Sequence, residues 1–262
     1  MTPPRSPFRG RRAVVTGASG GIGRSLALQL AEGGADLVLV ARSRDALDAV
    51  ADEVRTRGAT ASVLVADLAT EDGVAQVVRE LAGTRVDVLV ANAGVGAHGP
   101  FVDESPERTA TQIALNCAAV TALTHAFLPG MLARGVGGVM TVASTASFQP
   151  TPGMAVYGAT KAFVLSFTES LWQETRGRGV RVLALCPGPT STGFFDAAGA
   201  GDGVMARGRQ TPDEVAAVGL RAFARAGGPT VVSGAANRVT ANAHRFVPRG
   251  LMARVSALVT AG

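Results

Sequence analysis

A short strand, a glycine-rich turn and an apolar helix follow one another near the N-terminus, and this order constrains the fold more than any other feature. The strand-like run Ala13–Gly17 leads into Ala18-Ser19-Gly20-Gly21-Ile22-Gly23, and Ile22, Leu26 and Leu30 then recur at helical spacing. Glycines allow the backbone to approach a pyrophosphate closely, and a helix N-terminus offers N–H donors to an anion. The pattern therefore predicts a dinucleotide-binding turn at the start of an α/β sheet.

Strands and helices continue to alternate along the chain. The sequence predicts strands over 36–40, 60–65, 86–90, 138–143 and 180–185, and helices over 44–57, 70–82, 105–134 and from Tyr157 to about 177. Nearly continuous apolar strands separated by helices are typical of a parallel sheet covered on both faces. We therefore expect a single-domain, Rossmann-type doubly wound parallel sheet, a three-layer α/β/α fold with a C-terminal helical extension.

The end of the second strand favours one cofactor. An acidic residue there would bind the ribose hydroxyls of NAD, but this chain has Arg42. A guanidinium binds the 2′-phosphate of NADP in bidentate fashion. We therefore expect NADP(H).

Tyr157 is the only tyrosine in the chain and Lys161 the only lysine. Of the 25 lysine and arginine residues, the other 24 are arginine. Residues i and i+4 share one helix face, so the ammonium can lie beneath the phenol. A nearby ammonium stabilises the phenolate and lowers the pKa of the tyrosine. A planar guanidinium could not occupy the same place. The pair therefore suggests an acid–base centre.

Further motifs make the chain similar to the short-chain dehydrogenase/reductase family over about residues 11–233. Thr16, Gly17, Gly21 and Gly23 match its T-G-x-x-x-G-x-G turn, Asp67 its adenine contact and Asn92-Ala93-Gly94 its N-A-G motif. Asn116, Ser144, Tyr157 and Lys161 match its catalytic tetrad, and Pro187-Gly188 with Thr192 matches its nicotinamide loop. One departure is Ala91, where many members have a second asparagine.

The resemblance implies hydride transfer between NADP(H) and a carbonyl or alcohol carbon. Tyr157 would act as general acid or base, Ser144 would donate a hydrogen bond to the reacting oxygen, and Asn116 would hold a water that links Lys161 to solvent. Lys161 would also bind the nicotinamide ribose. The expected cofactor contacts are Gly17, Ser19, Gly20, Gly21, Ile22, Gly23, Arg42, Asp67, Leu68, Asn92, Ala93, Gly94, Tyr157, Lys161, Pro187, Gly188, Thr190 and Thr192.

The substrate is expected to be largely apolar, with ketone reduction as the reaction. Residues 193–210 contain Phe194, Phe195 and Met205, and in the family this region forms a mobile substrate lid. Phe148 and Met154 flank Ser144 and Tyr157 in sequence and add no charge.

Three segments follow from these boundaries: a flexible N-terminus (1–10), the NADP-binding domain (11–233) and a C-terminal helical extension of the same domain (234–262). The extension carries Leu251, Met252, Val255, Leu258 and Val259 at helical spacing, with Arg245, Arg249 and Arg254. Such a basic amphipathic helix can pack on its own domain, on a partner subunit, or weakly on a membrane surface.

We also expect a homodimer or homotetramer. The helix that carries Tyr157 bears Phe163, Phe167, Leu171 and Trp172, which is more apolar surface than one face of a sheet can cover. In the resembled family, this helix and the preceding long one form a dimer interface.

Bulk properties exclude several other classes. The net charge of +5 is spread along the chain without basic–aromatic clusters, which argues against nucleic-acid binding. Three histidines and two cysteines, all far apart, give no metal-site pattern. No secretory signal is evident, and no apolar run approaches the roughly 20 residues of a membrane span. Cys117 and Cys186 are expected to be free thiols in a reducing cytoplasm.

Three alternatives stay open at this point. The chain could be a 3-ketoacyl reductase acting on an acyl carrier protein, a peripheral membrane protein acting on lipids, or an NADP-binding sensor or scaffold without turnover. The complete tetrad argues against the sensor. Turnover of soluble ketones, and pull-down with a carrier protein or liposomes, would separate these possibilities.

Overall fold

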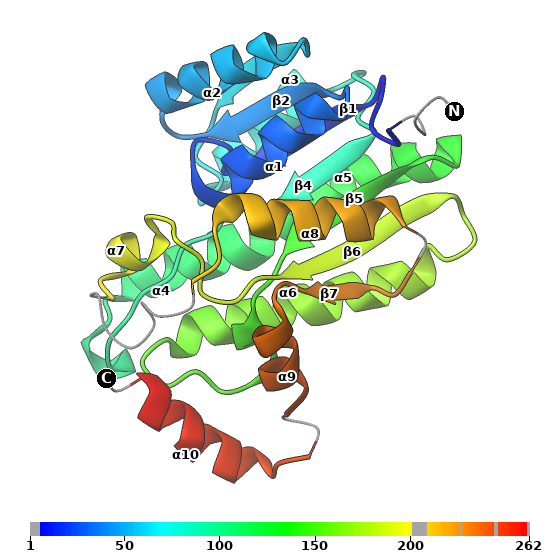
Figure 1. Ribbon diagram of the computed structural model, residues 1–262. Coiled ribbons are helices and arrows are strands. Elements are labelled where there is room, and N and C mark those ends of the chain that lie inside the picture. Colours follow the sequence, from blue (N-terminus) through cyan, green and yellow to red (C-terminus); the bar gives the residue numbers. More distant parts are fainter. Residues whose placement is uncertain (1–5, 201–208, 226, 244–245, 261–262) are drawn as a thin grey trace.

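The computed structural model describes residues 6–200, 209–225, 227–243 and 246–260, and the expected Rossmann-type sheet is present (Figure 1). Within these residues seven parallel strands lie in the order β3-β2-β1-β4-β5-β6-β7. They are β1 (Arg12–Thr16), β2 (Asp36–Ala41), β3 (Ala61–Val65), β4 (Val88–Ala91), β5 (Gly137–Val142), β6 (Val180–Cys186) and β7 (Thr230–Val232). The chain order reverses between β1 and β4, and ligands of such sheets bind at that crevice.

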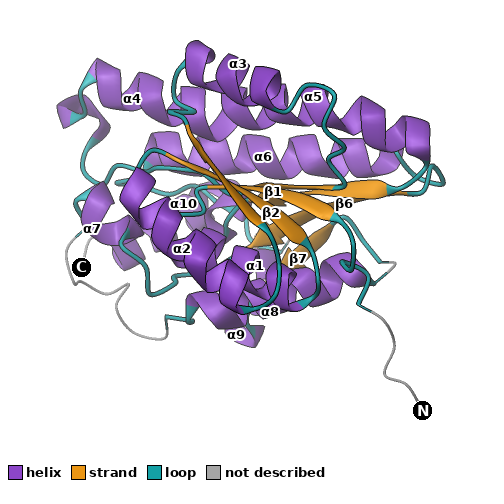
Figure 2. Ribbon diagram, turned by 90° about the horizontal axis from the view of Figure 1, so that it is seen from above, coloured by secondary structure: helices purple, strands orange, loops and turns teal. Residues whose placement is uncertain are grey.

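Helices cover both faces of the sheet, as Figure 2 shows. One layer contains α1 (Gly21–Glu32), α2 (Arg44–Thr56) and α8 (Pro212–Ala224). The opposite layer contains α3 (Glu71–Glu80), α4 (Pro106–Ile113), α5 (Ala119–Arg134) and α6 (Ala155–Glu174). The predicted helices agree with these bounds to within a few residues.

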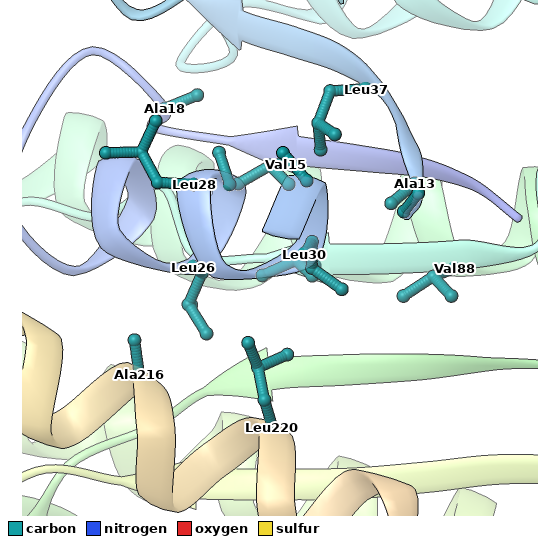
Figure 3. Packing of buried hydrophobic residues seen from close by; sticks show 14 of the residues in the cluster. Ala13, Val15, Ala18, Leu26, Leu28, Leu30, Leu37, Val88, Ala216 and Leu220 are labelled. Carbon is teal, nitrogen blue, oxygen red and sulfur yellow. The ribbon is translucent and has the colours of Figure 1, made fainter. Parts of the chain in front are cut away.

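The sequence interpretation did not include α8. Its start is well specified, because Thr211 and Glu214 form a reciprocal capping box at its N-terminus. Figure 3 shows Leu26 and Leu30 of α1 facing Ala216 and Leu220 of the neighbouring helix α8. α8 therefore completes the core on this face.

Part of the N-terminal segment differs from the expected flexible tail. Phe8 is 8% exposed and stacks on Phe223 of α8, with 6.3 Å between ring centroids. Apolar burial of this kind fixes residues 6–10 against the domain.

The predicted helix 105–134 is one helical stretch with a π-helical turn, η2 (Ala114–Ala118), between α4 and α5. It is the one helix of the described chain that is long and apolar enough to cross a membrane by length and composition, and 44% of its most apolar window is buried. A core helix passes the same test. The π turn redirects Asn116 into the interior, where it is 0% exposed.

The C-terminal extension forms two helices, α9 (Ala235–Ala243) and α10 (Arg249–Thr260). Met252 and Ser256, one turn apart, are buried, whereas Leu251 and Val255 are exposed. Arg245 lies outside the described residues, and the side chains of Leu258 and Val259 are not described. One face of α10 therefore packs on its own chain and another faces outward.

Candidate active site

A cleft of about 750 Å³ opens at the carboxyl ends of the strands, and the predicted cofactor residues line it almost completely. Gly23 is the exception. An added Cβ there would lie 2.2 Å from the carbonyl oxygen of Gly17, so Gly23 serves the packing of α1 against the turn. The strand ends thus bring together residues that are up to 175 positions apart in the sequence, from Gly17 to Thr192.

Thr16 joins the glycine turn to the loop after β4. Its hydroxyl oxygen accepts hydrogen bonds from the backbone N–H groups of Asn92 and Ala93, both at 3.0 Å. The Asn92 side chain donates to the Thr16 carbonyl oxygen at 2.9 Å. Gly17 adopts a φ of 64°, which favours glycine. The two loops that would hold a dinucleotide are therefore fixed to each other.

Arg42 and Asp67 lie at the end of the cleft formed by β2 and β3. Asp67 accepts a hydrogen bond from the Ala69 backbone N–H at 3.0 Å, whereas the exposed Arg42 guanidinium makes no hydrogen bond or ion pair within the described part of the chain. Arg42 is thus available to an anionic group in the cleft.

α6 presents Tyr157 and Lys161 one turn apart. The Lys161 ammonium lies 5.8 Å from the centroid of the Tyr157 ring and donates a hydrogen bond to the Val142 carbonyl oxygen at 2.8 Å. Ser144 follows β5 and accepts from the Ala146 backbone N–H at 3.1 Å, which leaves its hydroxyl proton free for the phenol oxygen. The acid–base pair and its hydrogen-bonding serine therefore meet as expected.

The pKa of Tyr157 moves in the direction opposite to the expectation. Burial raises the pKa of the phenol to about 12, and the hydrogen bond from Ser144 lowers it only in part. Burial also lowers the pKa of Lys161 to about 8. The Lys161 ammonium does not offset the burial of the phenol, so Tyr157 keeps its proton at ordinary pH.

The Asn116 side chain acts as a clamp. Its carbonyl oxygen accepts from the Val95 N–H at 2.9 Å, and its amide donates to the Val95 carbonyl oxygen at 2.8 Å and to the Thr160 hydroxyl at 2.9 Å. Thr160 in turn donates to the Tyr157 carbonyl oxygen at 2.8 Å. Asn116 therefore joins the loop after β4 to the helix of Tyr157, and its role in holding a water remains a prediction.

The predicted substrate residues are only partly brought together. Phe194, in α7 (Phe194–Ala198), and its neighbour Phe195 line the cleft. Met154 is buried beside Gly96 at the edge of the site. Phe148 does not line the cleft, because the 3-10 turn η3 (Thr145–Phe148) directs it against the cluster of Ala143, Val164, Leu165, Ala184 and Cys186. Met205 lies outside the described residues.

Comparison with known proteins settles the family. The short chain dehydrogenase family model matches residues 11–202. This chain belongs to the short-chain dehydrogenase family. As a short-chain dehydrogenase it is an oxidoreductase, and the fold described above is that of its family.

The curated relatives are longer than this chain. The bovine very-long-chain 3-oxoacyl-CoA reductase is 36% identical over 186 residues, which cover 69% of this chain and 60% of that protein. The chain thus spans less than two thirds of the length of this relative, and another curated relative is matched over only 15% of its length.

Solved structures are similar over most of the chain. A short-chain dehydrogenase from Sphingobium yanoikuyae in complex with NADPH is 34% identical, with a TM-score of 0.80 over 92% of this chain and 94% of that one. A bulky-bulky ketone specific alcohol dehydrogenase from Comamonas testosteroni is 30% identical, with a TM-score of 0.77 over 92% and 93%. A short chain dehydrogenase/reductase from Burkholderia phymatum, in complex with NAD, is 27% identical, with a TM-score of 0.81 over 92% of this chain and 97% of that one.

The site of this short-chain dehydrogenase fits a nicotinamide dinucleotide. The glycine turn provides open backbone, and Arg42 provides a guanidinium that has no partner among the described residues. The Lys161 ammonium lies beside Gly94 on the cleft wall. Sequence reasoning missed several supporting residues, among them Thr160, Ser147, Gln210 and Asn237. Ser147, for example, donates to the Lys161 carbonyl oxygen at 2.8 Å and accepts from the Ser144 N–H at 3.2 Å. These are ordinary polar residues in sequence, and only the fold brings them to the site.

Proposed function

We propose that this protein is an NADPH-dependent reductase of ketones with largely apolar substituents. The observation that carries the proposal is the Tyr157 phenol, which lines the cleft together with Ser144 and with Lys161 one helical turn away. Burial raises the pKa of the phenol to about 12, so the phenol can donate a proton to a carbonyl oxygen at neutral pH without prior protonation.

Each residue of the site has a separate role in the proposed reaction. NADPH, when bound, supplies the hydride. Tyr157 donates the proton, and Ser144 donates a hydrogen bond to the oxygen on which negative charge develops. Lys161, whose ammonium lies beside Gly94 on the cleft wall, would bind the nicotinamide ribose. α7 lines the catalytic end of the cleft through Phe194, Phe195 and Ala197.

The apolar substrate is inferred from the lining of the cleft. Among the described lining residues, the charged ones are Arg42, Asp67 and Lys161, and the first two lie at the far end. Gly96 and Phe194 lie beside Tyr157, and the cleft is further lined by the apolar residues Val95, Leu115, Ala143 and Phe195. Such walls bind substrates by apolar burial with few polar contacts.

NADP preference is supported by the unpartnered Arg42. A charge-assisted hydrogen bond contributes about 1.5–3 kcal/mol, which corresponds to about tenfold to a hundredfold in affinity. We expect wild-type protein to bind NADPH more tightly than NADH by that factor, and Arg42→Ala to remove the preference while NADH binding stays unchanged. Fluorescence titration with both cofactors tests this. Equal affinities in the wild type would contradict it.

A second candidate is reduction of 3-ketoacyl thioesters, which the 3-oxoacyl-CoA reductase relative favours. The two candidates use the same site and differ in whether the ketone is free or is part of an acyl thioester. NADPH oxidation measured with aryl and alkyl ketones, with 3-ketoacyl-CoA and with small charged keto acids decides between them. Turnover of charged keto acids above that of bulky ketones would overturn the proposal.

A further inference from the structure

The nicotinamide loop, residues 187–192, is held in place by residues that do not themselves line the cleft. Thr190 and Gln210 form an isolated parallel bridge. In it, the Ser191 N–H donates to the Gln210 carbonyl oxygen at 2.9 Å, and the Gln210 N–H donates to the Pro189 carbonyl oxygen at 3.0 Å. The backbone of Gln210 therefore fixes the second half of the loop.

The side chain of Gln210 connects this loop to the C-terminal extension. Its carbonyl oxygen accepts from the Ser233 hydroxyl at 2.7 Å and from the Asn237 amide of α9 at 3.4 Å. Ser233 is 0% exposed, and its backbone N–H donates to the Cys186 carbonyl oxygen at the end of β6, at 3.1 Å. The partners of Gln210 are thus anchored to the sheet.

Asn237 also lies directly against the loop. A Cβ added at Gly188 would overlap Nδ2 of Asn237 and would lie 2.5 Å from its Cγ and Oδ1. A Cβ added at Gly234, which has a φ of 85°, would lie 2.9 Å from the same Nδ2. The amide is oriented as well, because Nδ2 donates to the Ser233 carbonyl oxygen at 2.7 Å. Two glycines therefore make room for one oriented amide between α9 and the loop.

α9 reaches a second part of the site. It packs against η3, the turn that follows Ser144. The first residue of that turn, Thr145, donates its N–H to the Pro187 carbonyl oxygen of the nicotinamide loop at 2.8 Å. The loop, η3 and α9 therefore meet behind the catalytic end of the cleft.

We propose that Asn237 and Gln210 are positioning residues for the cofactor, which hold the nicotinamide loop where it meets the nicotinamide half of the dinucleotide. The C-terminal extension is then a working part of the cofactor site. The role in cofactor binding rests on the function proposed above, whereas the hydrogen bonds around Gln210 belong to the protein alone.

The first test divides the cofactor into its parts. Adenosine 2′,5′-bisphosphate carries the adenosine and the 2′-phosphate of NADPH but has no nicotinamide. Asn237→Ala removes the donor to two oxygens, so it should weaken NADPH binding by about threefold to tenfold and leave binding of the bisphosphate unchanged. Calorimetric titration measures both affinities. Equal weakening of the two ligands, or unchanged NADPH binding, would overturn the proposal.

Asn242→Ala is the matched control on the same helix. Nδ2 of Asn242 donates to the carbonyl oxygen four residues earlier, that of Arg238, at 2.7 Å, as Nδ2 of Asn237 does to that of Ser233. Asn242 is exposed and does not contact the loop. Both affinities should therefore stay at the wild-type value in Asn242→Ala, and a loss of NADPH binding equal to that of Asn237→Ala would show that α9 acts only through its own stability.

Two further variants separate hydrogen bonding from packing. Asn237→Asp keeps the shape of the side chain but turns a carboxylate oxygen toward the oxygens of Ser233 and Gln210, so it should weaken NADPH binding more than Asn237→Ala does. Gln210→Ala combined with Asn237→Ala should weaken binding less than the product of the two single effects, because both residues act on one loop. Wild-type binding in Asn237→Asp, or independent effects in the double variant, would contradict the proposed network.

The second test needs no cofactor. The backbone N–H groups of Ser191 and Gln210 report directly on the pairing that holds the loop. Asn237→Ala should speed amide hydrogen exchange at both by about threefold or more relative to Asn242→Ala, with exchange at Val15 in β1 unchanged. If the wild type binds neither NADPH nor the bisphosphate, the proposed function fails while exchange still tests the network. If NADPH binds and Asn237→Ala changes neither exchange nor affinity, the network has no positioning role and the function stands.

Discussion

At the scale of single residues, burial controls the acid–base pair more than the partners control each other. Lys161 is 5% exposed, and its pKa falls to about 8, while that of Tyr157 rises to about 12. Both shifts favour the neutral form of the group. The Lys161 ammonium uses the Val142 carbonyl oxygen as one acceptor, which fixes where its charge lies relative to Tyr157.

Two substitutions separate chemistry from folding. Tyr157→Phe removes the proton donor and keeps the ring, so we expect turnover to fall by about 10² or more with NADPH binding retained. Lys161→Arg keeps a positive charge but places a planar group where a compact one fits, so most activity and part of the cofactor affinity should be lost. Steady-state kinetics and NADPH titration measure both. Near-full activity in Lys161→Arg would show that a compact cation is not needed.

The pH dependence of ketone reduction should report Lys161. Its ammonium is protonated below about pH 8 and loses its proton as the pH rises through that value, whereas Tyr157 stays protonated until about pH 12. We therefore expect kcat/KM to decline above about pH 8. The residual activity of Lys161→Arg should lack this decline, because a guanidinium stays protonated. A flat profile in the wild type up to about pH 10 would contradict this assignment.

At the scale of elements, the carboxyl ends of the strands and the π turn form the site, while a buried charge cluster at the amino ends of the strands stabilises the fold. There Asp87, which is 1% exposed, accepts from the Arg85 guanidinium at 2.7 Å and from the Arg12 N–H at 3.1 Å. Arg11 and Arg134 lie 3.8 and 4.0 Å away. Burial raises the pKa of Asp87, but the hydrogen bonds and charges of Arg85 and its neighbours outweigh it and hold the pKa below 3.8.

Asp87→Asn should therefore lower the free energy of unfolding at neutral pH by about 1–3 kcal/mol. The carboxylate stabilises the fold fully above about pH 4, and this contribution is lost as the pH falls through the lowered pKa of the folded state. The difference from the wild type should thus shrink in acid. Asp52→Asn is a matched control, because Asp52 pairs with Arg55 on the exposed surface and should matter little. Denaturant unfolding at neutral and acid pH decides this, and equal effects of the two variants would refute it.

Local patterns in the sequence predicted the strands, the glycine turn and the Tyr157–Lys161 pair, because each depends on residues within one or two turns. Asn116 and Ser144 were predicted from the family resemblance. They did not show which residues meet across the fold. The contacts of Gly96 with Phe194 and of Gln210 with Ser233 join segments that lie far apart in sequence. Phe148 was misplaced for a related reason: nearness to Ser144 in sequence does not tell which way a 3-10 turn directs its side chain.

At the scale of the whole molecule, the α4–α6 layer leaves large apolar side chains in solvent. Ile113 is 50% exposed and Phe163 44%, and Phe163 stacks on Phe167 with 6.0 Å between centroids. The tail exposes apolar groups as well, with Val239 at 74%. Two surfaces thus compete as candidate contacts between subunits.

We expect a homo-oligomer that associates through the α4–α6 layer. Phe163→Asp should then yield monomers at micromolar concentration, while Val239→Asp on α9 leaves the assembly intact. Light scattering coupled to size-exclusion chromatography measures the mass of each variant. The reverse result would assign the contact to the C-terminal extension, and a monomeric wild type would reject the expectation altogether.

The bridge between Thr190 and Gln210 has a consequence for how such a protein can change its substrates. Thr190 and Gln210 pair as an isolated parallel bridge, so lengthening the segment between them while α7 keeps its contacts costs mainly the entropy of closing a loop, about 0.6 kcal/mol for each doubling. The segment between these residues can therefore differ in length at little cost in stability. We expect changes of sequence between Ser191 and Gln210 to alter what reaches Tyr157, while the sheet, the glycine turn and the Tyr157–Lys161 pair keep their structure.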